Sequence, residues 1–208
     1  MTAKNPFNPP APLEGLVHEN NVEFTHVLWT IHRTSGPYRR LWNEPRIWGP
    51  LKSSRWDPRD GPAVDQPERS VLYAATDFHT SVAEVFQKTR SIPLDPDFSV
   101  ASWRPSRPLI LLDLTGNWPI RAGASSSLHA ASKATCRNWA RTIRLAGPHL
   151  DGLLVRSTMT ASNNVILFGP SQDSFPSYPG FARPLNNVPE TLIWAVHREL
   201  GWPVRAMN

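Results

Sequence analysis

The chain has 208 residues, with 22 Lys and Arg against 17 Asp and Glu, a net charge of +5 and a pI near 9.9. This length fits one domain or at most two small ones, and it suffices to bury a core without disulfides. The aromatic content excludes a wholly disordered chain, and 22 prolines, about twice ordinary usage, exclude a helical bundle. The modest positive surplus favours an anionic partner, either nucleic acid, a phosphorylated small molecule or an acidic protein.

Cysteine usage indicates a reducing compartment, and the hydropathy of the sequence predicts no membrane span. Cys136 is the only cysteine, which excludes a disulfide framework and a cysteine-based metal site. No apolar run of about 18 residues exists, and residues 1–20 lack the apolar segment of a secretory signal. We therefore expect a cytoplasmic protein that does not span a membrane.

The first half of the chain alternates between short regular elements and proline-rich segments. Residues 1–22 predict a flexible or extended arm, because four prolines stand among polar neighbours. Residues 24–31 are rich in β-forming side chains and predict a strand. Residues 34–70 have no periodicity and predict one long irregular segment, and their aromatic side chains argue against disorder.

The remainder predicts buried strands at 71–75, 109–112, 153–155 and 165–168. Three helices are expected, one after the cap residue Asp77, one over 125–145 and one over 190–200. The first has an apolar stripe of Phe78, Val82, Val85 and Phe86, and the last is opened by Pro189 and ended by Gly201. Strands interleaved with few helices predict a single compact α+β domain over residues 23–208, with long proline-rich loops.

Several well-known site motifs are missing from the sequence. It contains no glycine-rich dinucleotide fingerprint, no Walker phosphate loop, no nucleophile elbow and no zinc-protease motif. The seven histidines show no metal-ligand spacing, so we expect no metal site.

Residues 38–59 form the densest basic and aromatic segment. Guanidinium groups bind phosphates in a bidentate manner, and aromatic faces stack on bases or flat heterocycles. The segment therefore fits a nucleotide site or a single-stranded nucleic-acid-binding module, and equally a solvated basic loop pinned by tryptophans. Glu44, Asp57 and Asp60 dilute its charge, which weighs against nucleic acid. Its members are Arg39, Arg40, Arg46, Lys52, Arg55 and Arg59 among Tyr38, Trp42, Trp48 and Trp56.

Three isolated residues are further candidates. Glu84 lies about 140° from the apolar stripe of its predicted helix, so its carboxylate faces either solvent or a cleft. Ser157 stands near the end of a buried strand, where loops position reactive groups. Arg33 ends the first strand in an apolar run, and a partly buried arginine needs an anion, either a protein carboxylate or a ligand phosphate.

The order of these residues resembles the RES domain, which is named for an arginine, a glutamate and a serine in that order. The resemblance extends from about residue 27 to residue 170. It rests on seven short pieces: Ile31-His32-Arg33, Ser54-Arg55-Trp56-Asp57-Pro58, Val71-Leu72-Tyr73-Ala74, Val82-Ala83-Glu84-Val85, Leu111-Leu112-Asp113-Leu114, Asp151-Gly152 with Arg156-Ser157, and Asn164-Val165-Ile166-Leu167-Phe168.

This resemblance implies a fold like that of ADP-ribosyltransferases and an activity on NAD⁺, which is consumed as a substrate with loss of nicotinamide, by either a glycohydrolase or a phosphorylase reaction. Some RES proteins instead transfer ADP-ribose to a protein. The family also implies a toxin that is neutralised by a helix-turn-helix antitoxin of the Xre-like type, with no direct contact to nucleic acid.

The resemblance further implies a role for each matching residue. Glu84, Ser157 and Arg33 would be the catalytic residues, and Arg33 and Arg55 would bind the cofactor phosphates. Tyr73 or Trp56 would line the nicotinamide end, and Asn164 would contact the cofactor.

The required chemistry is simple. Nicotinamide is already cationic in NAD⁺ and leaves without a general acid, through an oxocarbenium-like ribose that a carboxylate stabilises. No metal is needed.

The sequence departs from the family pattern at the arginine–tryptophan piece. Ser53-Ser54 replaces the usual glycines, and Asp57 stands where asparagine is common. An acidic residue beside a phosphate is unfavourable unless it is paired, so we expect Asp57 to pair with Arg59.

Overall fold

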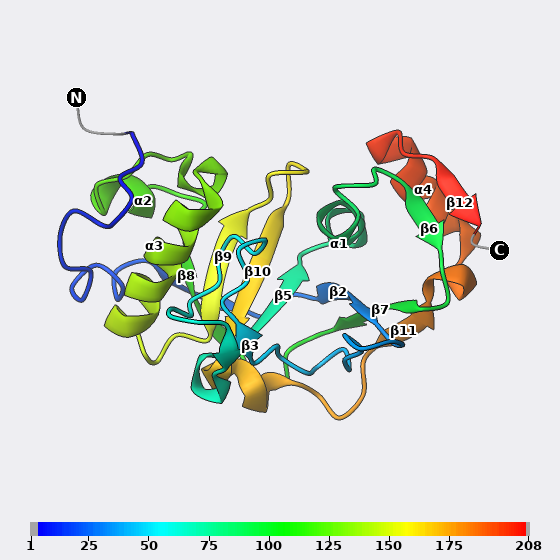
Figure 1. Cartoon of the computed structure of the whole chain (residues 1–208), viewed down its shortest axis with the longest axis horizontal. Coiled ribbons are helices and arrows are strands. Elements are labelled where there is room, and N and C mark those ends of the chain that lie inside the picture. The colour runs from blue at the N-terminus through cyan, green and yellow to red at the C-terminus, as the bar shows by residue number, and fades with distance from the viewer. Residues whose placement is uncertain (1–3, 207–208) are drawn as a thin grey trace.

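The computed structural model describes residues 4–206, and its main feature is a mixed sheet of eight strands (Figure 1). The strands pair in the order β1-β8-β9-β10-β5-β2-β7-β11, and only β8 and β9 run parallel. The predicted α+β class is confirmed. The strands are β1 (Asn21–Phe24), β2 (Leu28–Arg33), β5 (Val71–Ala75), β7 (Phe98–Trp103), β8 (Leu109–Asp113), β9 (Gly152–Arg156), β10 (Asn163–Phe168) and β11 (Phe181–Pro184).

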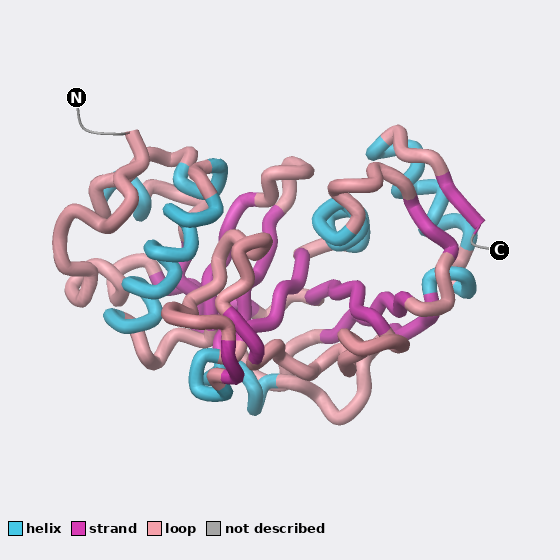
Figure 2. Tube along the Cα trace, in the orientation of Figure 1, coloured by secondary structure: helices cyan, strands magenta, loops and turns pink. Residues whose placement is uncertain are grey.

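Two small strand pairs and four α-helices flank this sheet. β3 (Trp48–Gly49) pairs with β4 (Val64–Asp65), and β6 (Ile92–Leu94) pairs in parallel with β12 (Val204–Ala206). The helices are α1 (Phe78–Val85), α2 (Trp118–Arg121), α3 (Lys133–Ala146) and α4 (Glu190–Leu200). Long connections occupy much of the remaining chain, as the predicted irregular segment 34–70 shows (Figure 2).

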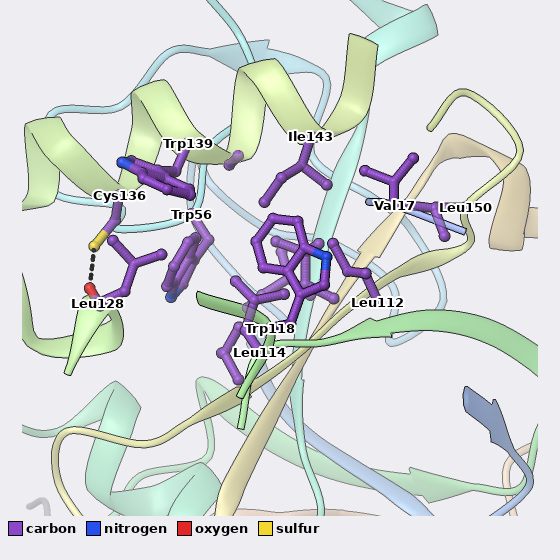
Figure 3. Packing of buried hydrophobic residues seen from close by; sticks show 14 of the residues in the cluster. Val17, Trp56, Leu112, Leu114, Trp118, Leu128, Cys136, Trp139, Ile143 and Leu150 are labelled. Atoms are coloured by element: carbon purple, nitrogen blue, oxygen red, sulfur yellow. Dashed lines mark hydrogen bonds between the residues drawn. The ribbon is translucent and has the colours of Figure 1, made fainter. Parts of the chain in front are cut away.

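Both faces of the central strands are buried, which explains their continuous apolar sequences. On one face, Leu112 and Leu153 pack beneath α2 and α3, whose Trp118, Trp139 and Ile143 fill the layer (Figure 3). On the other face, Leu111, Val165 and Leu167 pack with Trp103, while Trp42 and Phe175 from long loops cover them. A separate core lies between β2, β7, α1 and α4.

Three predicted elements have different boundaries in the structure. The strand expected at 24–31 is two strands, because β1 pairs with β8 whereas β2 pairs with β7. The helix expected over 125–145 begins at Lys133, where Ser132 Oγ accepts a hydrogen bond from Thr135 N at 3.0 Å as the N-cap. Val85, expected in the apolar stripe of α1, is exposed because it lines the two cavities described below.

The described N-terminal residues, from Lys4 onward, pack against the domain. Among the described residues of the predicted arm, Leu13 and Val17 are fully buried in the core under α3. The indole nitrogens of Trp118 and Trp139 donate to the carbonyls of Leu16 and Pro6, both at 2.9 Å. The predicted boundary at residue 22 also falls inside β1. From residue 14 to residue 20 the segment forms turns, with Val17 N donating to Leu13 O at 3.0 Å, and its apolar side chains are part of the core.

The sheet has a seam between β2 and β5. These strands share one paired position, Trp29 with Ala75, to which Thr30 Oγ1 adds a side-chain hydrogen bond to Tyr73 O at 3.1 Å. Every other pair of neighbours in this sheet shares three to six paired positions. The sheet therefore consists of two halves that diverge from this point (Figure 1).

Candidate functional site

A cleft of about 1040 Å³ opens along the seam. Its walls come from β2, β5, α1 and the segment 37–54, and this size is at the upper end for small-molecule sites. A smaller cavity of about 220 Å³ adjoins it beside α3 and the start of the β9–β10 turn. The residues that line both are Ser54, Tyr73, Glu84, Val85 and Asn164.

Glu84 lies where the two cavities meet. Asp77 caps α1 by accepting a hydrogen bond from Thr80 N at 2.7 Å, and Phe78 and Val82 anchor the helix in the core. This anchoring turns the opposite face of α1 toward the seam. The sequence predicts that Glu84 faces solvent or a cleft, and the structure places it half-buried in the cleft wall.

The carboxylate of Glu84 is held by two side chains that are distant in sequence. Its Oε1 accepts hydrogen bonds from Ser157 Oγ and from Asn164 Nδ2, each at 2.7 Å. No hydrogen bond to Oε2 is found within the part of the chain that the structure describes, residues 4–206. One carboxylate oxygen is therefore fixed by the protein, and the other is available to a ligand.

Ser157 is a buried residue that orients Glu84 and the following turn. Its Oγ donates to Glu84 and accepts hydrogen bonds from the backbone nitrogens of Met159 and Thr160, at 3.0 and 3.2 Å. The hydroxyl proton thus points at a carboxylate, and the oxygen lone pairs point at amides. This geometry suits a positioning residue.

The two arginines named by the resemblance line different cavities. Arg33 lines the large cleft together with Glu84, but it is exposed rather than partly buried, and its guanidinium lies 4.5 Å from the ring centroid of Phe98. Arg55 lines the small cavity, where it donates to the carbonyl of Ala131 and lies 3.7 Å from Cys136 Sγ. Glu84 lines both cavities, and it is the one acidic residue among the five that do.

The two aromatic candidates differ in accessibility. Trp56 is only 3% exposed and packs with Leu128, Cys136 and Trp139 in the core, so its ring serves mainly to pin the chain under α3 (Figure 3). Tyr73 lines both cavities, but its hydroxyl is buried. Burial raises the pKa of Tyr73 well above its usual value, and the negative charge of Asp57 raises it further, so the phenol stays protonated.

Asp57 forms the pair that the sequence predicts, and a second one. Its carboxylate is fully buried and accepts hydrogen bonds from Arg59 Nε at 2.8 Å, Arg46 Nη2 at 2.9 Å and Leu51 N at 3.0 Å. Burial opposes its ionisation, but the hydrogen bonds from Arg59 and Leu51 and the charge of Arg46 outweigh burial and lower the pKa of Asp57.

Arg40 and Arg46 are cleft residues that the sequence did not single out. Both lie in the basic segment 38–59, and both line the large cleft. The density of arginines in that segment was the only available signal, because nothing local distinguishes them from Arg39 or Lys52.

The described residues give no sign of a metal centre or of a transmembrane helix. No group of three or more His, Cys, Asp or Glu side chains within residues 4–206 could hold a metal ion. Within the same range, no helix has both the length and the apolar character needed to cross a bilayer.

Comparison with known proteins identifies the family. No curated protein matches the chain. A crystal structure of the M. tuberculosis MbcT–MbcA toxin–antitoxin complex contains a chain of similar fold, with a TM-score of 0.59 at 14% identity. That likeness covers 90% of this chain and 97% of that chain. The family model of the RES domain matches residues 27–186, which include β2, the cleft, Glu84, Ser157 and Asn164, and the chain therefore belongs to the RES domain family.

Proposed function

We propose that this protein cleaves NAD⁺ at the bond between nicotinamide and ribose. The observation that carries the proposal is the Glu84 carboxylate, held by Ser157 and Asn164 at the junction of two cavities with basic walls. The fold likeness to a chain of a toxin–antitoxin complex and the RES family membership support a toxin role. An antitoxin of the helix-turn-helix, Xre-like type would then be the partner.

In the proposed reaction, the C1′–N bond breaks and its electron pair goes to the pyridinium nitrogen, which leaves as neutral nicotinamide. The ribose becomes an oxocarbenium-like cation, which the free Oε2 of Glu84 stabilises. Water then adds at C1′ and loses a proton, so the products are ADP-ribose, nicotinamide and H⁺. The ring of Tyr73 supplies an aromatic wall, and Arg33 supplies positive charge for the phosphates.

The test is nicotinamide release by the purified chain. We expect turnover by the wild type and a loss on the order of 10²–10³-fold in kcat for Glu84→Gln, which keeps the shape but removes the charge. Glu68→Gln is the matched control, because Glu68 is exposed and outside both cavities. Equal turnover by wild type and Glu84→Gln would refute the assignment of Glu84.

The same residues also suit transfer of ADP-ribose to a protein, with an acceptor side chain in place of water. Incubating cell lysate with labelled NAD⁺ separates the two reactions. Free labelled ADP-ribose supports hydrolysis, and a discrete labelled protein band supports transfer.

Nucleic-acid binding through residues 38–59 is less well supported by the packing. Trp42 lies against Trp103 and Phe175, and Trp56 is in the core. Arg59 is buried against Asp57. Two of the four aromatic side chains and Arg59 are thus taken up by internal packing, and Tyr38 and Trp48 remain exposed.

A further inference from the structure

The arginines of the large cleft are not balanced by acidic groups. The guanidinium of Arg40 has no hydrogen bond and no ion pair among residues 4–206, although the side chain is only half exposed. Its neighbour Arg46 shares the single carboxylate of Asp57 with Arg59, and also donates to Ser54 Oγ at 3.4 Å and to the carbonyl of Trp48. The other nearby acid is Glu44, which is exposed and accepts a hydrogen bond from Leu41 N at 2.9 Å.

The guanidinium groups of Arg40, Arg46 and Arg59 carry like charges and repel one another. Burial lowers the pKa of Arg40, and the like charge of Arg46 lowers it further, with a smaller opposite effect from Glu44. The pKa of Arg46 is also lowered, first by burial and then by the charge of Arg59. Guanidinium groups crowded in a partly desolvated wall are stabilised when an anion lies between them.

Two other polar atoms bordering this part of the cleft lack partners. Tyr73 Oη, beside Arg46, and His32 Nδ1, beside Arg40, are buried without a hydrogen bond of normal geometry in the described chain. His32, Arg40, Arg46 and Tyr73 all line the cleft. Unsatisfied buried polar groups of this kind mark places where a ligand or an ordered water completes the structure.

We propose that Arg40 and Arg46 form an anion-binding subsite that holds the diphosphate of a dinucleotide. The guanidinium of Arg40 has no other partner among residues 4–206, so its paired N–H donors can bind the oxygens of a diphosphate. Arg46 already donates to Trp48 O, Ser54 Oγ and Asp57, so it contributes mainly positive charge. Arg55, which the family resemblance assigns to the phosphates, already donates to Ala131 O and lines the other cavity. That the diphosphate belongs to NAD⁺ rests on the proposed function, whereas the anion site itself does not.

The test measures binding of inorganic pyrophosphate to the full chain by titration calorimetry, in the absence of turnover. Arg40→Gln is the informative variant, because Arg40 has no partner that the substitution would leave unpaired. We expect its affinity for pyrophosphate to fall on the order of tenfold to a hundredfold. Arg198→Gln, an exposed arginine on α4, should bind as the wild type does.

Binding of further ligands shows which kind of molecule supplies the anion that the subsite binds. ADP should bind through the same subsite and lose affinity in Arg40→Gln, and binding should weaken as salt rises. Equal pyrophosphate binding by wild type and Arg40→Gln would overturn the subsite, as would tighter binding of a single-stranded oligonucleotide than of ADP. Failure of nicotinamide release with intact, Arg40-dependent pyrophosphate binding would instead refute only the proposed reaction.

Discussion

At the scale of single residues, the site depends on how one carboxylate is fixed. Glu84 comes from a helix, Ser157 from a turn and Asn164 from a strand, and both hydrogen bonds end on the same oxygen. Because the hydrogen bonds to Oε1 already immobilise the Glu84 side chain, Oε2 keeps its direction without further loss of side-chain entropy. Ser157 acts here through Glu84, so its removal should affect the reaction without affecting substrate binding.

Ser157→Ala should therefore lower kcat on the order of tenfold to a hundredfold and leave KM nearly unchanged. The reason is that a hydrogen bond to a charged group is lost and Glu84 is less well oriented in the transition state. Steady-state kinetics of nicotinamide release measure this split. Ser171→Ala is the control, since its buried hydroxyl also donates a single hydrogen bond, to Phe168 O, but lies outside both cavities. A larger change in KM than in kcat would contradict the positioning role.

At the scale of elements, the segment 34–70 is ordered by an internal ion network rather than by regular structure. Asp57 joins Arg46, Leu51 and Arg59, and the Arg46 backbone in turn pairs with Val71 of β5. The segment that carries the cleft arginines is thereby attached to the sheet. Breaking this network should destabilise the domain as a whole.

Asp57→Asn keeps the shape but leaves two arginines without a carboxylate. We expect the free energy of unfolding at pH 7 to fall by about 3–5 kcal/mol. Because the folded-state pKa of Asp57 is lowered, its contribution is complete above the unfolded value of about 3.9 and is lost as pH falls through the folded-state pKa. The difference between variant and wild type should thus narrow in urea titrations below about pH 4. Asp65→Asn, at an exposed position, should show little change at any pH.

The strands and helices that are specified by residues close together in the sequence were predicted correctly. The apolar runs of β5, β8 and β10, the Asp77 cap and the Pro189–Gly201 limits of α4 are all present. The sequence did not predict β11, because it lies at the edge of the sheet in a proline-rich stretch and depends on pairing with β7. The burial of Trp56 could not be predicted for the same reason, since it depends on long-range packing under α3, although the residue also borders the small cavity.

At the scale of the whole molecule, the N-terminal residues that the structure describes, from Lys4 onward, belong to the folded unit. The described part of residues 1–22 covers α3 and α2, and Gly123, with a φ of +86°, has no room for a Cβ beside Pro10. Asn5 accepts hydrogen bonds from Ser125 N and Oγ at 3.0 and 2.8 Å. Side chains near the start of the chain therefore contribute to global stability.

Leu13→Ala should lower the free energy of unfolding by about 2–5 kcal/mol, because Leu13 is 1% exposed and the core cannot fully close the cavity. Denaturation followed by tryptophan fluorescence measures the change close to its origin, at Trp118 and Trp139. Phe7→Ala serves as the comparison, since Phe7 is 56% exposed and its substitution should lower the free energy of unfolding only slightly. Equal midpoints for Leu13→Ala and wild type would mean that the segment is not part of the cooperative unit.

The seam between β2 and β5 has a mechanical consequence. Changing the angle between the two halves of the sheet would break the Trp29–Ala75 pairing and the bond from Thr30 to Tyr73, whereas parting any other neighbours breaks three or more paired positions. A change in the curvature of the sheet therefore breaks the fewest strand pairings along the floor of the cleft. Widening there would admit a long, bent ligand, and it would shift Leu28 and Trp103 against the apolar side chains of β5, β8 and β10, while the layer under α2 and α3 stays intact.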